Sequence, residues 1–189
     1  WSKEKGITLV IDESFVDFAE DEDSSLIEQS ILSSNRHLFV MKSISKSYGV
    51  PGLRLGVLAS GNVEAIKAIK KNVSIWNINS FAEFYLQIEE KYHKDYLASL
   101  TRIKEERERF FSKLSSIEGL RAIPSEANYI MVEITNGKKA TEVTKRLLSD
   151  YGILIKDLSA KIKGGEYLRL AVRDTKDNDR LIDALSNVL

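Results

Sequence analysis

The chain has 189 residues with 28 basic and 28 acidic side chains, so it is formally neutral at pH 7. Neutrality argues against a dedicated surface for nucleic acid or for an anionic membrane, because both require clustered lysine and arginine. The absence of cysteine excludes disulfides, a thiol nucleophile and a thiolate metal site, and no apolar run approaches the roughly 18–20 residues of a membrane span.

The first part of the chain alternates strand and helix patterns. Residues 7–11 form a continuous apolar run, which is typical of a parallel strand covered on both faces. The next expected elements are a helix over residues 25–32, strands over 38–41 and 55–59, and a helix over 63–71. This order predicts an α/β sheet, in which functional loops lie at the carboxyl ends of the strands.

The second part of the chain has a different organisation. Residues 80–114 repeat apolar side chains at helical spacing, and the mixed charges at 104–109 predict a solvated helix face with local ion pairs. The elements expected after it are a strand over 128–134, a helix over 140–150, strands over 153–155 and 167–172, and a closing helix over 178–189. We therefore expect two domains, at residues 1–95 and 96–189, the second a compact α+β module.

The most informative segment surrounds Lys46, in the sequence Lys-Ser-Ile-Ser-Lys-Ser-Tyr-Gly, with Arg54 eight residues further on. The hydroxyls of Ser43 and Ser45 and the guanidinium of Arg54 can hold a phosphate while the amine of Lys46 reaches an aldehyde. That combination describes pyridoxal phosphate (PLP), held by a lysine and a phosphate clamp. Lys42, the other amine of the segment, is expected to be a surface residue.

A carboxylate is the second anchor of this hypothesis. Asp12 ends the first predicted strand, 34 residues before Lys46. We expect both groups at one edge of the sheet, because each follows the carboxyl end of a strand. A carboxylate beside the pyridine nitrogen of PLP raises the pKa of that nitrogen and keeps it protonated, as an electron sink requires.

These motifs resemble those of fold-type-I PLP enzymes, class I/II aminotransferases, in the branch of histidinol-phosphate aminotransferase and threonine-phosphate decarboxylase. The resemblance rests on Asp-Glu-Ser-Phe at residues 12–15 and on the spacing of Ser43, Ser45, Lys46 and Arg54. It implies that Lys46 forms a Schiff base with PLP and moves the substrate proton. It also implies that the aspartate pairs with the ring nitrogen, while the two serines and the arginine bind the phosphate.

Two further positions concern the substrate. The strand pattern around Arg169 resembles the family segment whose arginine binds the substrate α-carboxylate, and Arg173 is a weaker candidate for a phosphate or structural contact. Phe15 stands where many aminotransferases carry tyrosine, and phenylalanine cannot donate that hydrogen bond to the cofactor. Some relatives on the decarboxylase side carry phenylalanine.

The glycine-bearing phosphate loop, the stacking aromatic residue and the Asn-Pro-rich stretch of the family do not occur in this sequence. We therefore expect a fragment: the C-terminal half of the PLP-binding large domain followed by the small C-terminal domain. The expected full-length protein is a cytoplasmic homodimer without nucleic-acid or membrane partners. We expect the fragment alone to be inactive and to bind PLP weakly or not at all.

The expected function is the transfer of an amino group between an amino acid and a keto acid. Three alternatives remain open: a PLP decarboxylase of the threonine-phosphate type, a non-catalytic fragment of a larger bifunctional protein, and an unrelated doubly wound module that cradles another phosphate. No metal site is expected, because His37 and His93 are isolated from other ligands.

Overall fold

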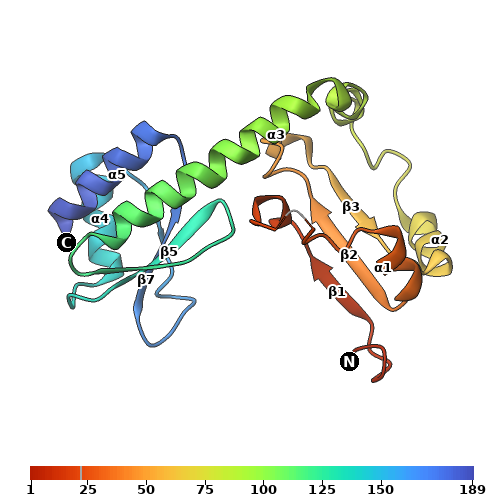
Figure 1. Cartoon of the computed structure of the whole chain (residues 1–189), viewed down its shortest axis with the longest axis horizontal. Coiled ribbons are helices and arrows are strands. Elements are labelled where there is room, and N and C mark those ends of the chain that lie inside the picture. The colour runs from red at the N-terminus through yellow and green to blue at the C-terminus, as the bar shows by residue number, and fades with distance from the viewer. Residues whose placement is uncertain (22) are drawn as a thin grey trace. The chain divides into compact units, whose positions relative to one another are not determined.

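The computed structural model describes residues 1–21 and 23–189, which form two compact units, Trp1–Leu100 and Thr101–Leu189 (Figure 1). The first unit contains β1 (Leu9–Asp12), the 3-10 helix η1 (Val16–Phe18), α1 (Gln29–Ser34), β2 (Leu38–Ser43), the 3-10 helix η2 (Pro51–Leu53), β3 (Gly56–Ala59) and α2 (Val63–Asn72). Helix α3 (Ser80–Ser115) begins in the first unit and ends in the second.

The sheet of the first unit has the order β1-β2-β3, with β2 in the middle (Figure 1). Strands β1 and β2 are parallel, and β3 runs antiparallel to β2. In the parallel pair, Asp12 lies opposite Met41. The loops that follow β1 and β2 therefore leave the sheet at the same edge, as the sequence predicts.

One face of this sheet is packed and the other is open among the residues that the structure describes. Leu38 is 5% exposed and Val40 is fully buried on one face. On the other face Val10 and Met41 remain 53% and 44% exposed. The expectation of a strand covered on both faces is therefore wrong for this stretch of polypeptide, since successive side chains of a strand point to opposite faces and only one set is buried.

Helix α1 begins at Gln29, four residues later than the sequence predicts. The residues before it are bound to Glu13 instead. The buried carboxylate of Glu13 accepts hydrogen bonds from the Ser25 hydroxyl at 2.8 Å and from the Leu26 amide at 2.6 Å. These bonds tie residues 25 and 26 to the loop after β1.

The second unit is an antiparallel sheet with two helices of its own. Its elements after α3 are β4 (Leu120–Ile123), β5 (Tyr129–Ile134), α4 (Ala140–Tyr151), β6 (Lys156–Asp157), β7 (Glu166–Ala171) and α5 (Thr175–Val188), and the strand order is β4-β5-β7-β6. The sequence analysis missed β4, whose short stretch Leu-Arg-Ala-Ile includes a charged residue and forms no continuous apolar run.

Strand β6 lies later in the chain than the residues 153–155 that the sequence predicts. Helix α4 ends at Gly152, which has a left-handed backbone with φ of 64°. The amide of Ile153 then donates to the carbonyl of Leu147 at 2.9 Å. The amide of Gly152 donates to the carbonyl of Leu148 at 3.0 Å, which is the bond of the αL motif. Sheet pairing begins only at Lys156.

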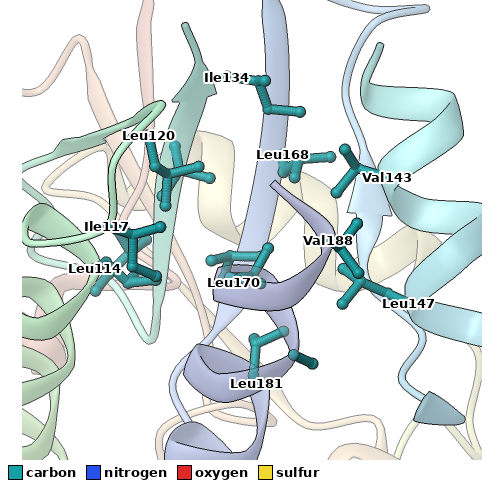
Figure 2. Close-up of a cluster of buried hydrophobic side chains, with 14 of the residues drawn as sticks. Leu114, Ile117, Leu120, Ile134, Val143, Leu147, Leu168, Leu170, Leu181 and Val188 are labelled. Atoms are coloured by element: carbon teal, nitrogen blue, oxygen red, sulfur yellow. The ribbon is translucent and has the colours of Figure 1, made fainter. Parts of the chain in front are cut away.

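A continuous hydrophobic core joins the sheet to the helices of the second unit (Figure 2). Leu168 and Leu170 of β7 are fully buried, and they meet Leu114 of α3 and Leu147 of α4 in this cluster. Because neighbouring side chains of a strand alternate, Arg169 points to the other face of the sheet.

The charged stretch at residues 104–109 is more buried than the sequence predicts. Arg107 is only 4% exposed, and its guanidinium donates to the carbonyl of Ala127 at 3.1 Å. Glu106 accepts hydrogen bonds from Arg109 and from the buried Asn178. The expected solvated face is therefore wrong at these positions, because α5 packs on this part of α3 and supplies polar partners.

Candidate active site

Asp12 and the loop after β2 are joined through Ser14. Oδ1 of Asp12 accepts hydrogen bonds from the amide of Ser14 at 2.9 Å and from its hydroxyl. The same hydroxyl accepts a hydrogen bond from the amide of Ser43 at 3.1 Å. Ser14 is only 7% exposed, so the link lies out of water. The sequence analysis did not single out Ser14, since nothing in its local pattern reveals a partner 29 residues away.

The carboxylate of Asp12 is held in its ionised form. The hydroxyl and the amide of Ser14 lower its pKa, and the positive charge of Lys46 adds a smaller effect in the same direction. Asp12 is exposed at this edge of the sheet. The arrangement presents a stable negative charge to a cationic group, such as a protonated pyridine nitrogen.

Lys46 is exposed, and its amine lies over an aromatic ring. Nζ is 4.2 Å from the centre of the Phe15 ring, a cation–π distance. Because Phe15 follows Asp12 in the loop after β1, this contact joins the two loops a second time. The structure therefore brings Asp12, Phe15 and Lys46 together.

The expected phosphate clamp includes a hydroxyl without a partner. Ser45 is 5% exposed, and its Oγ has no hydrogen-bond partner among residues 1–21 and 23–189. Buried polar atoms are almost always paired, so this hydroxyl fits a ligand that accepts a hydrogen bond. The amide of Ser45 donates a hydrogen bond to Oγ of Ser43 at 3.4 Å, and this bond stabilises the turn.

Arg54 has an unusual backbone. Its φ is 58°, in the left-handed region that residues other than glycine rarely adopt, and the side chain is exposed. One guanidinium nitrogen donates to the carbonyl of Pro51 at 3.2 Å. The hydroxyl of Ser45, unpartnered in the described part of the chain, and the exposed guanidinium of Arg54 fit the phosphate-bearing group that the sequence predicts.

Lys42 is not a surface residue, contrary to the sequence analysis. Its side chain is 18% exposed, and Nζ lies 2.5 Å from Oδ1 of Asp17, whose side chain is 15% exposed. The reason is the strand alternation: β2 extends to Ser43, which places Lys42 on the same packed face as the buried Val40.

Tyrosines fix the end of the same loop. The ring of Tyr48 stacks on that of Tyr96 of α3, with centres 4.0 Å apart and planes inclined by 9°. Burial raises the pKa of Tyr96, and the negative charge of Asp17 raises it further. Both hydroxyls therefore stay protonated near neutral pH.

The second unit contains a pocket of about 860 Å³ around Arg169. Its charged lining comprises four cations and two carboxylates: Lys156, Arg169, Arg173, Arg180, Asp157 and Asp177. Arg173 pairs with Asp177 at 2.6 Å, and Arg180 donates to the carbonyl of Tyr151.

Lys156 and Arg169 lie directly opposite each other across β6 and β7. Neither forms an ion pair within the described part of the chain, and two like charges facing each other across strands are unfavourable without a counter-ion. Arg169 also lies 5.2 Å from the centre of the Tyr129 ring. The pocket is therefore suited to an anion. Lys156 was missed because the register of β6 could not be read from the sequence.

Two other kinds of site were sought across residues 1–21 and 23–189. No cluster of three or more His, Cys, Asp or Glu side chains in these ranges could hold a metal ion. None of the helices there combines the length and hydropathy that spanning a membrane requires.

The sequence was then compared with known proteins. The family model "Aminotransferase class I and II" matches residues 1–185. The chain belongs to this family. Enzymes of the family depend on PLP, and the fold-type-I architecture and the branch that the sequence predicts are confirmed.

The relatives include both kinds of enzyme. The CMP-5'-(3-aminopropyl)phosphonate synthase of Streptomyces rubellomurinus is 34% identical, over 97% of this chain and 29% of its own length. The threonine-phosphate decarboxylase of Salmonella typhimurium is 31% identical, over 99% of this chain and 50% of its own length. The histidinol-phosphate aminotransferase structure from Clostridium acetobutylicum matches with a TM-score of 0.89 and 30% identity, covering 99% of this chain and 55% of that one. The chain thus spans about half or less of these relatives.

Proposed function

We propose that the protein containing this chain is a PLP-dependent enzyme that transfers the amino group of a substrate carrying a phosphate or phosphonate. One observation carries the proposal. The ionised carboxylate of Asp12 and the amine of Lys46 lie at one edge of the sheet, in loops joined through Ser14. A pyridine ring with an aldehyde needs a carboxylate and an amine in this combination.

Each residue of this edge has a distinct role. PLP supplies an electron sink when it is bound. Asp12 holds a proton on the ring nitrogen, which requires the ionised state that Ser14 stabilises. Lys46 binds the cofactor through its amine and, once released, takes the proton from the substrate Cα and returns it. Ser43, Ser45 and Arg54 donate to the phosphate.

The pocket around Arg169, whose charged lining is mostly cationic, supports the proposed substrate class. Arg169 presents a planar fork that suits the α-carboxylate of the substrate. Lys156, opposite it across the strands, adds a second positive charge for a phosphate or phosphonate. The names of the relatives are in line with this assignment, because the decarboxylase and the aminotransferase act on phosphorylated compounds and the synthase is named for a phosphonate.

Decarboxylation of a phosphorylated amino acid is the second candidate reaction. The specific observation in its favour is Phe15, which contacts the Lys46 amine through its ring and has no hydroxyl to offer the cofactor. Serine-phosphate and threonine-phosphate decarboxylases among the relatives are 31–33% identical to this chain. The two reactions differ in whether the Cα–H or the Cα–carboxylate bond is broken.

The test uses the full-length protein with O-phosphoserine and O-phosphothreonine. Keto-acid formation measures aminotransfer, and release of carbon dioxide measures decarboxylation. We expect one of the two activities, and we expect Lys46→Ala to abolish it. A Lys46→Ala protein that retains full function would support the non-catalytic alternative instead. Light scattering of the same protein tests the homodimer that we also propose.

A further inference from the structure

The loop that carries Lys46 has a second amine, and the two have different surroundings. Nζ of Lys42 is in contact with Oδ1 of Asp17 at 2.5 Å, and neither side chain is more than 18% exposed. Nζ of Lys46 lies over the Phe15 ring, exposed, with no carboxylate within ion-pair distance in residues 1–21 and 23–189. The amine of Lys42 is therefore held in an ion pair, whereas the amine of Lys46 is accessible to a ligand.

Asp17 is firmly placed. It is the middle residue of η1, which is anchored by the fully buried Phe18 and by a 3.0 Å hydrogen bond from the Phe18 amide to the Phe15 carbonyl. Its charge also reaches the hydroxyl of Tyr96, whose pKa is raised by burial first and by Asp17 second. If Lys42 left, the poorly hydrated carboxylate of Asp17 would keep its hydrogen bond with Tyr96 but lose its counter-charge, which is unfavourable.

The chemistry of aldehyde capture makes this difference consequential. A neutral amine donates its lone pair to the carbonyl carbon, and the oxygen leaves as water after two proton transfers to it. An ammonium has no lone pair, so it cannot attack. Lys42 must leave its contact with Asp17 before it can react, whereas no carboxylate holds Lys46 in residues 1–21 and 23–189.

We propose that Asp17 is a positioning residue that reserves the cofactor aldehyde for Lys46 by holding Lys42 as an ion pair. The inference rests on the proposed PLP function for its biological meaning. The difference in reactivity between the two amines, however, is a property of this chain and holds for any electrophile.

The first experiment needs neither PLP nor a variant. The cofactor-free full-length protein is treated with limiting acetic anhydride at about pH 8, where a minority of lysine amines is neutral, and the modified peptides are quantified by mass spectrometry. Lys67, an exposed lysine of α2, is the internal reference. We expect Lys42 to react about tenfold more slowly than Lys67, the effect of one charge-assisted hydrogen bond. Equal rates would overturn the proposal.

The second experiment uses PLP and borohydride. Hydride reduces the bond between amine and aldehyde carbon to a stable secondary amine, and peptide mapping gives the ratio of Lys42 to Lys46 adducts. We expect Asp17→Asn to raise this ratio about tenfold. The matched control Asp95→Asn removes an exposed carboxylate from the same unit and leaves the ratio unchanged, and Asp17→Glu, which keeps the charge, restores a low ratio.

The outcomes separate this inference from the proposed function. An unchanged ratio in Asp17→Asn, with a native circular dichroism spectrum, contradicts the role of Asp17. Absence of a Lys46 adduct in the unsubstituted protein contradicts the PLP function, while the acetylation rate of Lys42 in Asp17→Asn compared with the unsubstituted protein still decides on Asp17. If Asp17→Asn does not fold, equal acetylation of Lys42 and Lys67 in the unsubstituted protein would still overturn the proposal.

Discussion

The hydroxyl of Ser14 donates a hydrogen bond to the carboxylate of Asp12 and accepts one from the amide at the end of β2. A single buried hydroxyl thus connects the two loops that carry the proposed cofactor residues. It also lowers the pKa of Asp12 more than any other group does. Ser14 is therefore a positioning residue for both ends of the site.

We expect Ser14→Ala to weaken PLP binding by the full-length protein about tenfold, since it removes a hydrogen bond to a charged group and leaves the amide of Ser43 without its partner. Titration of the protein with PLP, followed by absorption, measures the change. Ser186→Ala, which removes an exposed hydroxyl bonded only to its own helix, is the control. Equal affinities of the three proteins would show that the link through Ser14 is unimportant.

The pocket around Arg169 makes a prediction about substrate choice. Lys156→Met is expected to raise the KM for a phosphorylated amino acid about tenfold, because it removes a charge-assisted contact. The KM for the same amino acid without phosphate should change little. Lys161→Met, at an exposed position outside the pocket, is the control. An equal rise in KM for both substrates would mean that Lys156 does not bind the phosphate.

Glu106 makes the stability of the second unit depend on pH. Its hydrogen bonds with Arg109 are the main cause of a pKa lowered from 4.5 to about 2. A group with a lowered folded-state pKa stabilises the fold above its unfolded value of 4.5 and loses this contribution as the pH falls toward 2. We expect urea denaturation to show a falling free energy of unfolding over this range.

The variant Glu106→Gln should be less stable than the unsubstituted protein by about 1–3 kcal/mol at neutral pH. The difference should shrink at about pH 3, because Glu106 takes up a proton there in the unfolded chain while it stays ionised in the folded one. Glu108→Gln replaces an exposed carboxylate of the same helix and serves as the control. A difference that stays constant from neutral to acid pH would contradict the assignment.

The core of the second unit predicts a large effect of truncation. Leu170 is fully buried between the sheet and the helices, so Leu170→Ala should destabilise the protein by about 2–5 kcal/mol. Leu148 is 51% exposed on α4 and gives the matched control, for which Leu148→Ala should have a much smaller effect. Thermal unfolding measures both effects. Similar decreases in the unfolding temperature of the two variants would contradict the assignment of Leu170 to the core.

The existence and order of β1 and β2 were predictable from the sequence, because apolar runs followed by polar residues mark buried strands, although β2 continues two residues beyond the predicted end. Asp12 and Lys46 were proposed as site residues for this reason, together with the spacing between them. The partners of these residues could not. The contact of Ser14 with Ser43 and the pairing of Lys42 with Asp17 join segments 29 and 25 residues apart, and no local pattern encodes them.

Lys156 shows a second limit of the sequence. Its importance comes from lying opposite Arg169, which depends on the register of a two-residue strand. Residues 152–155 lie between the end of α4 and this strand, and no residue pattern there marks where pairing starts. A pattern of apolar residues placed the strand earlier in the chain and pointed to the wrong residues. Short strands are positioned by their neighbours, so their register appears only in the structure.

The most direct test of the account is the visible absorption of the full-length protein after addition of PLP and removal of the excess. We predict a stable band of covalently bound cofactor that disappears in Lys46→Ala and persists in Lys42→Met. A band that survives Lys46→Ala unchanged, or that never forms in the unsubstituted protein, would contradict the central claim that Lys46 is the amine that holds PLP.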